Sequence, residues 1–264
     1  MGGERVTGQG GTDTGGGAAA RTPILRGRLS AAARAKAGRR AMAVAARHPR
    51  LWRFVRAALR RRFEAAAERW SAISGRMGSP HFAAVGAALA RLPGTFAPTA
   101  IADVGTGTGL LALGLAERFR EAAVTGFDFA PAMVARARAH RDDPHEALDE
   151  ALRARLRFEV ADSSALPLAA GDLDLVVLSN TPIFFAEVAR VLRPGGFAVV
   201  AFSHGPRTPL YLPLAEVEAG LARAGCPLVA RGEAGEGEWL LARRAAVVPR
   251  ARAGDAGGEA DDER

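Results

Sequence analysis

From Thr99 onward, short runs of apolar residues alternate with segments whose apolar positions recur at helical spacing. The runs are too continuous for strands with one face in water, so they indicate strands buried on both faces. This pattern is typical of a mainly parallel sheet with helices packed on each side. We predict strands at 99–104, 123–128, 155–160, 173–179, 196–203, 226–231 and 238–244, and helices at about 109–119, 131–140, 146–153, 183–192 and 213–224.

The last two predicted strands are joined by a short link that contains Gly232, Gly235 and Gly237. This link cannot hold the helix that a parallel crossover needs, so we expect an antiparallel hairpin at the edge of the sheet. The chain is therefore predicted to adopt an α/β fold, a Rossmann-like doubly wound sheet of seven strands, mainly parallel, with an antiparallel edge hairpin.

Two helices are predicted ahead of the sheet. After Pro49, apolar residues recur three or four positions apart from Trp52 to Trp70, which is the spacing of one helix face. A second helix begins at Ser79–Pro80, where serine suits the N-cap and proline the first helical position. This helix ends before Pro93–Gly94. Further along the chain, residues 142–153 form a charged helical insertion that we expect to be exposed.

The chain is thus divided into four parts. Residues 26–98 form an arginine-rich helical cap, and residues 99–248 form the main domain. The glycine-rich residues 1–25 and the polar residues 249–264 have little to bury, so we expect both to be disordered tails.

The charge is unevenly distributed. The chain has 36 Lys and Arg against 28 Asp and Glu, a net charge of +8, and between Arg26 and Arg62 there are 13 basic residues and no acidic one. A solvated arginine face, a substrate lid and a nucleic-acid-binding arm over residues 26–62 all fit this pattern.

The composition excludes several classes of protein. A hydrophobic fraction of 48% suffices for a core, and no apolar run is long enough to span a membrane. A single cysteine, Cys226, excludes a disulfide scaffold and a cysteine-based metal site. We expect a cytoplasmic location and no metal.

One segment carries chemistry, Ala102-Asp103-Val104-Gly105-Thr106-Gly107-Thr108-Gly109, at the end of the first main strand. Glycines at such a strand-to-helix turn let the backbone approach a ligand. Asp128 ends the next strand, where a carboxylate can accept both hydroxyls of an adenosine ribose. NAD and S-adenosylmethionine are the competing ligands. Asp103 would repel a pyrophosphate but suits the ammonium group of a methionine moiety.

Residues 100–204 resemble a class I S-adenosylmethionine-dependent methyltransferase of the small methyltransferase-domain family. Five segments match in family order: ADVGTGTG, GFDFAPAMVARAR, FEVADSSALPL, DLDLVVLSN and VARVLRPGGFAVVAF. The resemblance implies S-adenosylmethionine as the cofactor and methyl transfer as the activity.

The resemblance also implies a set of cofactor-binding residues. Asp103 and the backbone of the glycine turn would surround the methionine part, and Asp128 would bind the ribose. Phe129 and Met133 would lie along the adenine, and Asp162 would accept from its amino group. The full set is Asp103, Gly105, Thr106, Gly107, Gly109, Asp128, Phe129, Met133, Asp162, Ser163, Ser179 and Asn180.

The resemblance does not identify the methyl acceptor, because the loop after Asn180, which often holds substrate in this family, is shortened in this sequence. A small molecule is the favoured partner. The alternatives are a nucleic-acid methyltransferase that uses residues 26–62 and a binding domain of the same fold without activity. No catalytic residue is assigned. If the acceptor must lose a proton, His204 is the best-placed base, ahead of His81 and Tyr211.

Overall fold

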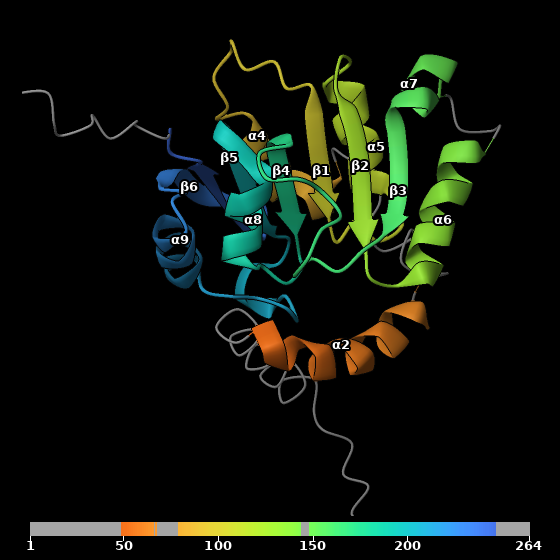
Figure 1. Cartoon of the computed structure of the whole chain (residues 1–264), viewed down its shortest axis with the longest axis horizontal. Coiled ribbons are helices and arrows are strands. Elements are labelled where there is room, and N and C mark those ends of the chain that lie inside the picture. The colour runs from red at the N-terminus through yellow and green to blue at the C-terminus, as the bar shows by residue number, and fades with distance from the viewer. Residues whose placement is uncertain (1–48, 66, 68–78, 144–147, 247–264) are drawn as a thin grey trace, which may run out of the picture.

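The computed structural model describes residues 49–65, 67, 79–143 and 148–246. Seven strands form one sheet in the order β3-β2-β1-β4-β5-β7-β6 (Figure 1). Strands β1 to β5 pair in parallel, and β7 runs antiparallel to both β5 and β6. The predicted fold is therefore confirmed. The strands are β1 Ala100–Val104, β2 Ala123–Asp128, β3 Leu156–Val160, β4 Leu173–Ser179, β5 Leu192–Phe202, β6 Leu228–Ala234 and β7 Gly237–Arg243.

Two strands, β5 and β6, differ from their predicted boundaries by two residues or more. Strand β5 begins at Leu192 rather than residue 196, because Leu192 already pairs with Leu173 before the register shifts. Strand β6 starts two residues later than predicted and continues to Ala234, which pairs with Gly237 across a two-residue turn. Gly235 in this turn has φ +58°, a backbone conformation that glycine adopts without strain.

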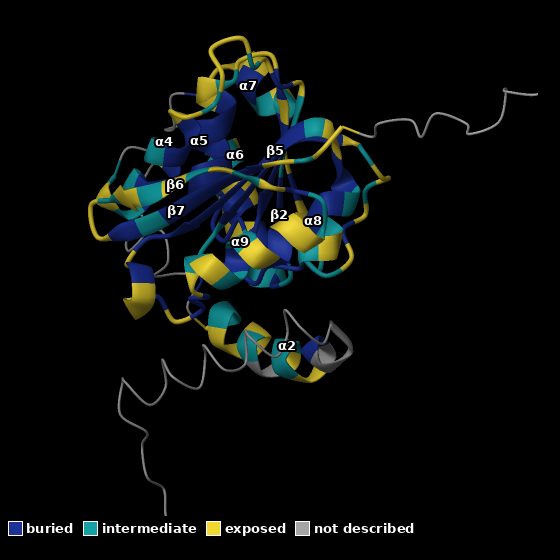
Figure 2. Ribbon diagram, turned by 90° about the vertical axis from the view of Figure 1, so that its left-hand side faces the viewer, coloured by how far each residue is buried: buried dark blue, intermediate teal, exposed yellow. Residues whose placement is uncertain are grey.

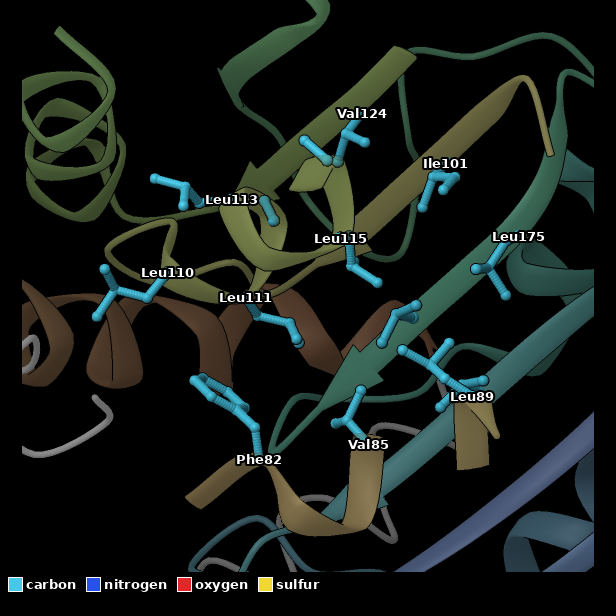
Figure 3. Close-up of a cluster of buried hydrophobic side chains, with 14 of the residues drawn as sticks. Phe82, Val85, Leu89, Ile101, Leu110, Leu111, Leu113, Leu115, Val124 and Leu175 are labelled. Carbon is cyan, nitrogen blue, oxygen red and sulfur yellow. The ribbon is translucent and has the colours of Figure 1, made fainter. Parts of the chain in front are cut away.

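Helices cover both faces of the sheet. One face carries α4 Ala83–Leu89, α5 Leu110–Arg118, α6 Pro131–Asp142 and α7 Glu150–Arg155, and the other carries α8 Phe185–Val191 and α9 Leu214–Arg223. Figure 3 shows the first of the two cores, where leucines of α5 meet Val85 and Leu89 of α4 and Ile101 of β1. The edge strands β3 and β6 contain several exposed residues, whereas β1, β2, β4, β5 and β7 are largely buried (Figure 2). Burial on both faces explains their near-continuous apolar sequence.

The predicted cap consists of two different parts. Helix α2, Pro49–Glu64, runs across the edge of the sheet at which the parallel strands end (Figure 1). Helix α4 instead packs on the sheet beside β5, β6 and β7. The second predicted helix begins with a 3-10 turn, η1 Pro80–Phe82, without a side-chain cap, and α4 ends at Leu89 rather than Leu92. The predicted continuation of the first helix at residues 66 and 68–70, and both predicted tails, lie outside the described residues.

The charged insertion is not fully exposed as predicted. Its helix, α7, spans Glu150–Arg155 and is capped by Asp149, whose carboxylate accepts from the backbone N–H of Leu152 at 2.6 Å. Leu148 and Leu152 are buried in the core beside β3, and these two apolar contacts hold the segment against the domain. In the described part of the chain, no helix is long and apolar enough to cross a membrane.

Candidate functional site

A cleft lies at the carboxyl ends of β1, β2 and β4, where α2 and η1 face the sheet. Ligands of open α/β folds bind at this edge. The cleft is lined by nine of the twelve predicted residues, namely Asp103, Gly105, Thr106, Gly107, Asp128, Phe129, Met133, Ser179 and Asn180. Gly109, Asp162 and Ser163 do not line it.

The glycine turn is attached directly to the neighbouring strand. The backbone N–H groups of Gly105 and Thr106 both donate to the carbonyl of Phe127, at 2.8 and 2.9 Å. Gly105 has φ +77°, and a Cβ there would lie 2.2 Å from Oγ1 of Thr181. Gly109, at φ +84°, packs close to the ring of Phe158 instead, so its place in the turn is explained by helix packing.

Asp103 is a buried carboxylate without a counter-charge. Asp103 is 1% exposed, and the hydroxyl of Thr106 donates to its Oδ2 at 2.7 Å. Burial raises the pKa of Asp103 to about 7, although the Thr106 hydrogen bond acts in the opposite direction. Among the described residues, no basic side chain forms an ion pair with it, so this carboxylate is suited to receive a cationic ligand group.

Asp128 joins the glycine turn to the next helix. Oδ2 accepts from the backbone N–H of Gly107 at 3.0 Å, and Oδ1 accepts from that of Ala130 at 2.9 Å. Burial raises the pKa of Asp128 to about 6, and the backbone hydrogen bonds limit this rise. A carboxylate has about four acceptor positions, so both oxygens can still accept from a ligand.

Ser179 and Asn180 form the wall of the cleft at the end of β4. The Ser179 hydroxyl is buried and has no hydrogen-bond partner among the described residues, which leaves a polar group for a ligand to satisfy. Asn180 has φ +54°, a conformation that no other described non-glycine residue adopts. Its amide bonds to Ser203 through both its oxygen and its nitrogen, which holds the strained residue in place.

Asp162 lies under α2 rather than in the cleft. It forms an ion pair with Arg56 and accepts from Nε1 of Trp52 at 2.7 Å and from the N–H and hydroxyl of Ser164, both at 2.9 Å. Burial opposes ionisation, yet these hydrogen bonds keep the pKa of Asp162 below its usual range. Ser164, which was not among the predicted residues, is therefore a serine that contacts this carboxylate.

Aromatic rings of α2 cover the adjoining part of the site. Trp52 and Phe63 contact the ring of Phe129 edge to face, with centroid distances of 5.9 and 5.8 Å. Ala67, just beyond α2, packs on Met133. The apolar spacing of the first helix placed Trp52 and Phe63 on one face, but it did not indicate that this face would lie over the site.

The three candidate bases have different surroundings. His204 is half-exposed, and its Nδ1 lies 3.0 Å from Glu236. The Tyr211 hydroxyl donates to Glu238 at 3.0 Å, and burial, with this carboxylate, raises the pKa of Tyr211 to about 12. His81 alone of the three lines the cleft. His81, rather than His204, is therefore the one of the three that could contact a ligand in the cleft.

A doubly wound sheet with a glycine turn and two acidic strand ends at its ligand-binding edge defines a class I methyltransferase fold. In agreement with this class, residues 101–196 match the family model described as a methyltransferase domain. Residues 101–196 are thus similar in sequence to a methyltransferase domain, and the sheet that contains them has the class I methyltransferase fold.

Curated relatives and solved structures agree with this assignment. The chain is 38% identical over 119 residues to malonyl-[acyl-carrier protein] O-methyltransferase of Hahella chejuensis, covering 42% of this chain and 39% of the relative. It is 43% identical over 111 residues to demethylmenaquinone methyltransferase of Thermus thermophilus, covering 39% and 47%. A solved methyltransferase from Aquifex aeolicus superposes with a TM-score of 0.54 at 17% identity, covering 67% of this chain and 98% of that one. The chain thus spans less than half the length of these two curated relatives.

Proposed function

We propose that this protein transfers a methyl group from S-adenosylmethionine to a small-molecule acceptor. The observation that carries the proposal is the pair of buried carboxylates, Asp103 and Asp128, at the ends of neighbouring strands on either side of the glycine turn. Asp103 offers a negative charge to the ammonium group of the cofactor, and Asp128 offers acceptors to the ribose hydroxyls. The orphaned Ser179 hydroxyl is available to a third polar group.

The cofactor, when bound, supplies a methyl group that is already activated on a sulfonium. The protein then has to hold the acceptor close to that methyl group and keep water away from it. Trp52 and Phe63 of α2 exclude water from the part of the site beside Phe129.

The predicted contact between Asp162 and the adenine amino group has a structural condition. Oδ1 of Asp162 already accepts three hydrogen bonds, and Oδ2 pairs with Arg56. For Asp162 to bind the adenine, the amino group would have to reach the remaining acceptor position of Oδ2, beside Arg56 of α2. Phe129 and Met133, which line the cleft, are supported as adenine neighbours without such a condition.

The test is the affinity for S-adenosylmethionine, measured by calorimetry. Asp128→Ala should weaken binding at least tenfold, because hydrogen bonds to a charged group are worth about 1.5–3 kcal/mol each. Asp142→Ala is the matched control, since Asp142 is an exposed carboxylate that pairs with Arg141 away from the cleft. Equal affinity of native protein and Asp128→Ala would refute the assignment.

A thermal-shift comparison separates a site for S-adenosylmethionine from a site for NAD and from a domain without a cofactor site. S-adenosylmethionine at 100 times its dissociation constant should stabilise the protein by about 2.7 kcal/mol, and NAD should not. A silent binding domain that lacks a cofactor site would respond to neither.

The acceptor class is supported by the relatives' names, which refer to a carrier-protein-bound malonyl group and to a quinone precursor. Neither name refers to nucleic acid. In the described part of residues 26–62, Arg56 pairs with Asp162 and Arg60 with Glu64, so part of the basic charge is neutralised within the chain.

A cytoplasmic location stays a prediction, supported by the buried free thiol of Cys226.

A further inference from the structure

A second cavity adjoins the cofactor cleft. It has a volume of about 210 Å³ and lies between α2, the ends of β4 and β5, and the segment that follows β5. Phe63, His81, Asn180 and Leu210 line both the cleft and this cavity, so the two spaces share a wall. A molecule in the second cavity would therefore lie next to a ligand in the first.

The lining of the second cavity favours an apolar anion. Leu59, Phe63, Pro209 and Leu210 provide an apolar surface, and Arg62 adds a positive charge. Hydroxyl, amide and imidazole groups supply the remaining polar positions. Among the described residues, no acidic side chain lines this cavity.

The amide of Asn180 determines which nitrogen of His81 carries a hydrogen. Oδ1 of Asn180 accepts from the backbone N–H of Ser203 at 2.9 Å, which fixes the orientation of the amide. Its Nδ2 therefore donates to the Ser203 hydroxyl at 3.0 Å and faces Nε2 of His81 at 3.3 Å. An amide nitrogen can only donate, so Nε2 is the acceptor, and the neutral ring carries its hydrogen on Nδ1.

This arrangement makes His81 a hydrogen-bond donor rather than a base. A second proton would have to bind Nε2, against the N–H of Asn180. Burial lowers the pKa of His81, and the neighbouring ring of His204 lowers it further. An acceptor held by His81 must therefore be nucleophilic without giving a proton to this ring.

We propose that the second cavity binds the methyl acceptor, that the acceptor is an apolar molecule with a carboxylate or phenolate oxygen, and that the Nδ1–H of His81 positions that oxygen. This inference rests on the proposed function. A lone pair of the oxyanion forms the new O–C bond as the C–S bond breaks and its electron pair stays on sulfur. The opposite charges cancel, and no proton is transferred.

The test compares two probes of equal shape on the full chain saturated with S-adenosylhomocysteine. Calorimetry should give at least tenfold tighter binding of 2-naphthoate than of the neutral 2-naphthamide. His81→Phe should weaken 2-naphthoate binding about tenfold. His81→Asn, whose amide nitrogen lies near the position of Nδ1, should retain affinity within threefold. Asp142→Ala is the control, because Asp142 lines neither the cleft nor the second cavity, and it should have less than a threefold effect.

A spectroscopic measurement on the native protein avoids any folding defect of the variants. The ¹⁵N shifts of the His81 ring at pH 7.5 should show a neutral imidazole with its hydrogen on Nδ1. Equal binding of the two probes, or a hydrogen on Nε2, would overturn the inference. Failure of S-adenosylhomocysteine to bind would instead refute the proposed function, so the two failures are distinguishable.

Discussion

Replacing Asp103 by asparagine should make the protein more stable at pH 8, because the native carboxylate is buried without a counter-charge. Its pKa is about 7 in the folded protein against an ordinary value of 3.8, a rise of about three units. Each unit corresponds to about 1.4 kcal/mol, so the ionised side chain destabilises the fold by about 4 kcal/mol. Asparagine has nearly the same shape, can still accept from Thr106 and carries no charge.

The stability gained by Asp103→Asn should depend on pH. Because the pKa is raised on folding, the folded state binds the proton more tightly than the unfolded state between about pH 4 and pH 7. The contribution of Asp103 to stability therefore decreases as pH rises through this window. The advantage of Asp103→Asn should be about 4 kcal/mol at pH 8 and about 2 kcal/mol at pH 5. At pH 8 this corresponds to a rise in melting temperature of about 10 °C.

Asp174→Asn is the matched control, because Asp174 is equally buried but fully partnered. It accepts from the backbone N–H groups of Thr99 and Ala100, at 2.6 and 2.9 Å, and forms an ion pair with Arg193. Burial opposes its ionisation, yet these contacts hold the pKa of Asp174 below its usual range. Its substitution should destabilise the fold by about 1–3 kcal/mol. If Asp103→Asn gives no gain at pH 8, or the same gain at pH 5, the electrostatic reasoning is wrong.

Three further predictions concern the cofactor and the glycines. Affinity for S-adenosylmethionine, measured by calorimetry, should fall as pH decreases from 8 to 5, because Asp128 has a pKa of about 6 and loses its charge. Asp128→Asn should abolish the part of this pH dependence that comes from Asp128. Gly105→Ala should destabilise the fold by about 1–3 kcal/mol in urea unfolding, since φ is +77° and the new Cβ would overlap Thr181. Gly86→Ala should instead raise stability by about 0.5–1 kcal/mol, because Gly86 lies within α4 and has open space where a Cβ would be.

Much of the fold follows from local sequence. Strands β1, β2 and β4 are apolar on both faces, and the glycine turn joins β1 to α5 directly, so periodicity and turn chemistry located them closely. The positions of Asp103 and Asp128 followed as well. Carboxyl ends of parallel strands meet at one edge of a sheet, whatever the details of packing.

Contacts between distant segments could not be predicted in this way. Asp162 is 110 residues from Trp52 and 106 from Arg56 along the chain. No local sequence pattern indicates that side chains of α2 form hydrogen bonds with its carboxylate. The tautomer of His81 likewise depends on Asn180, 99 residues away.

The sequence by itself determined the sheet, the glycine turn and the acidic strand ends, because each depends on hydrophobic period or on backbone conformation within one segment. Only the tertiary structure decided which of the predicted residues share the cleft, which are covered by α2, and that a second cavity begins at His81. Those outcomes depend on how the surfaces of separate elements pack together, and a contact between surfaces has no period along the chain.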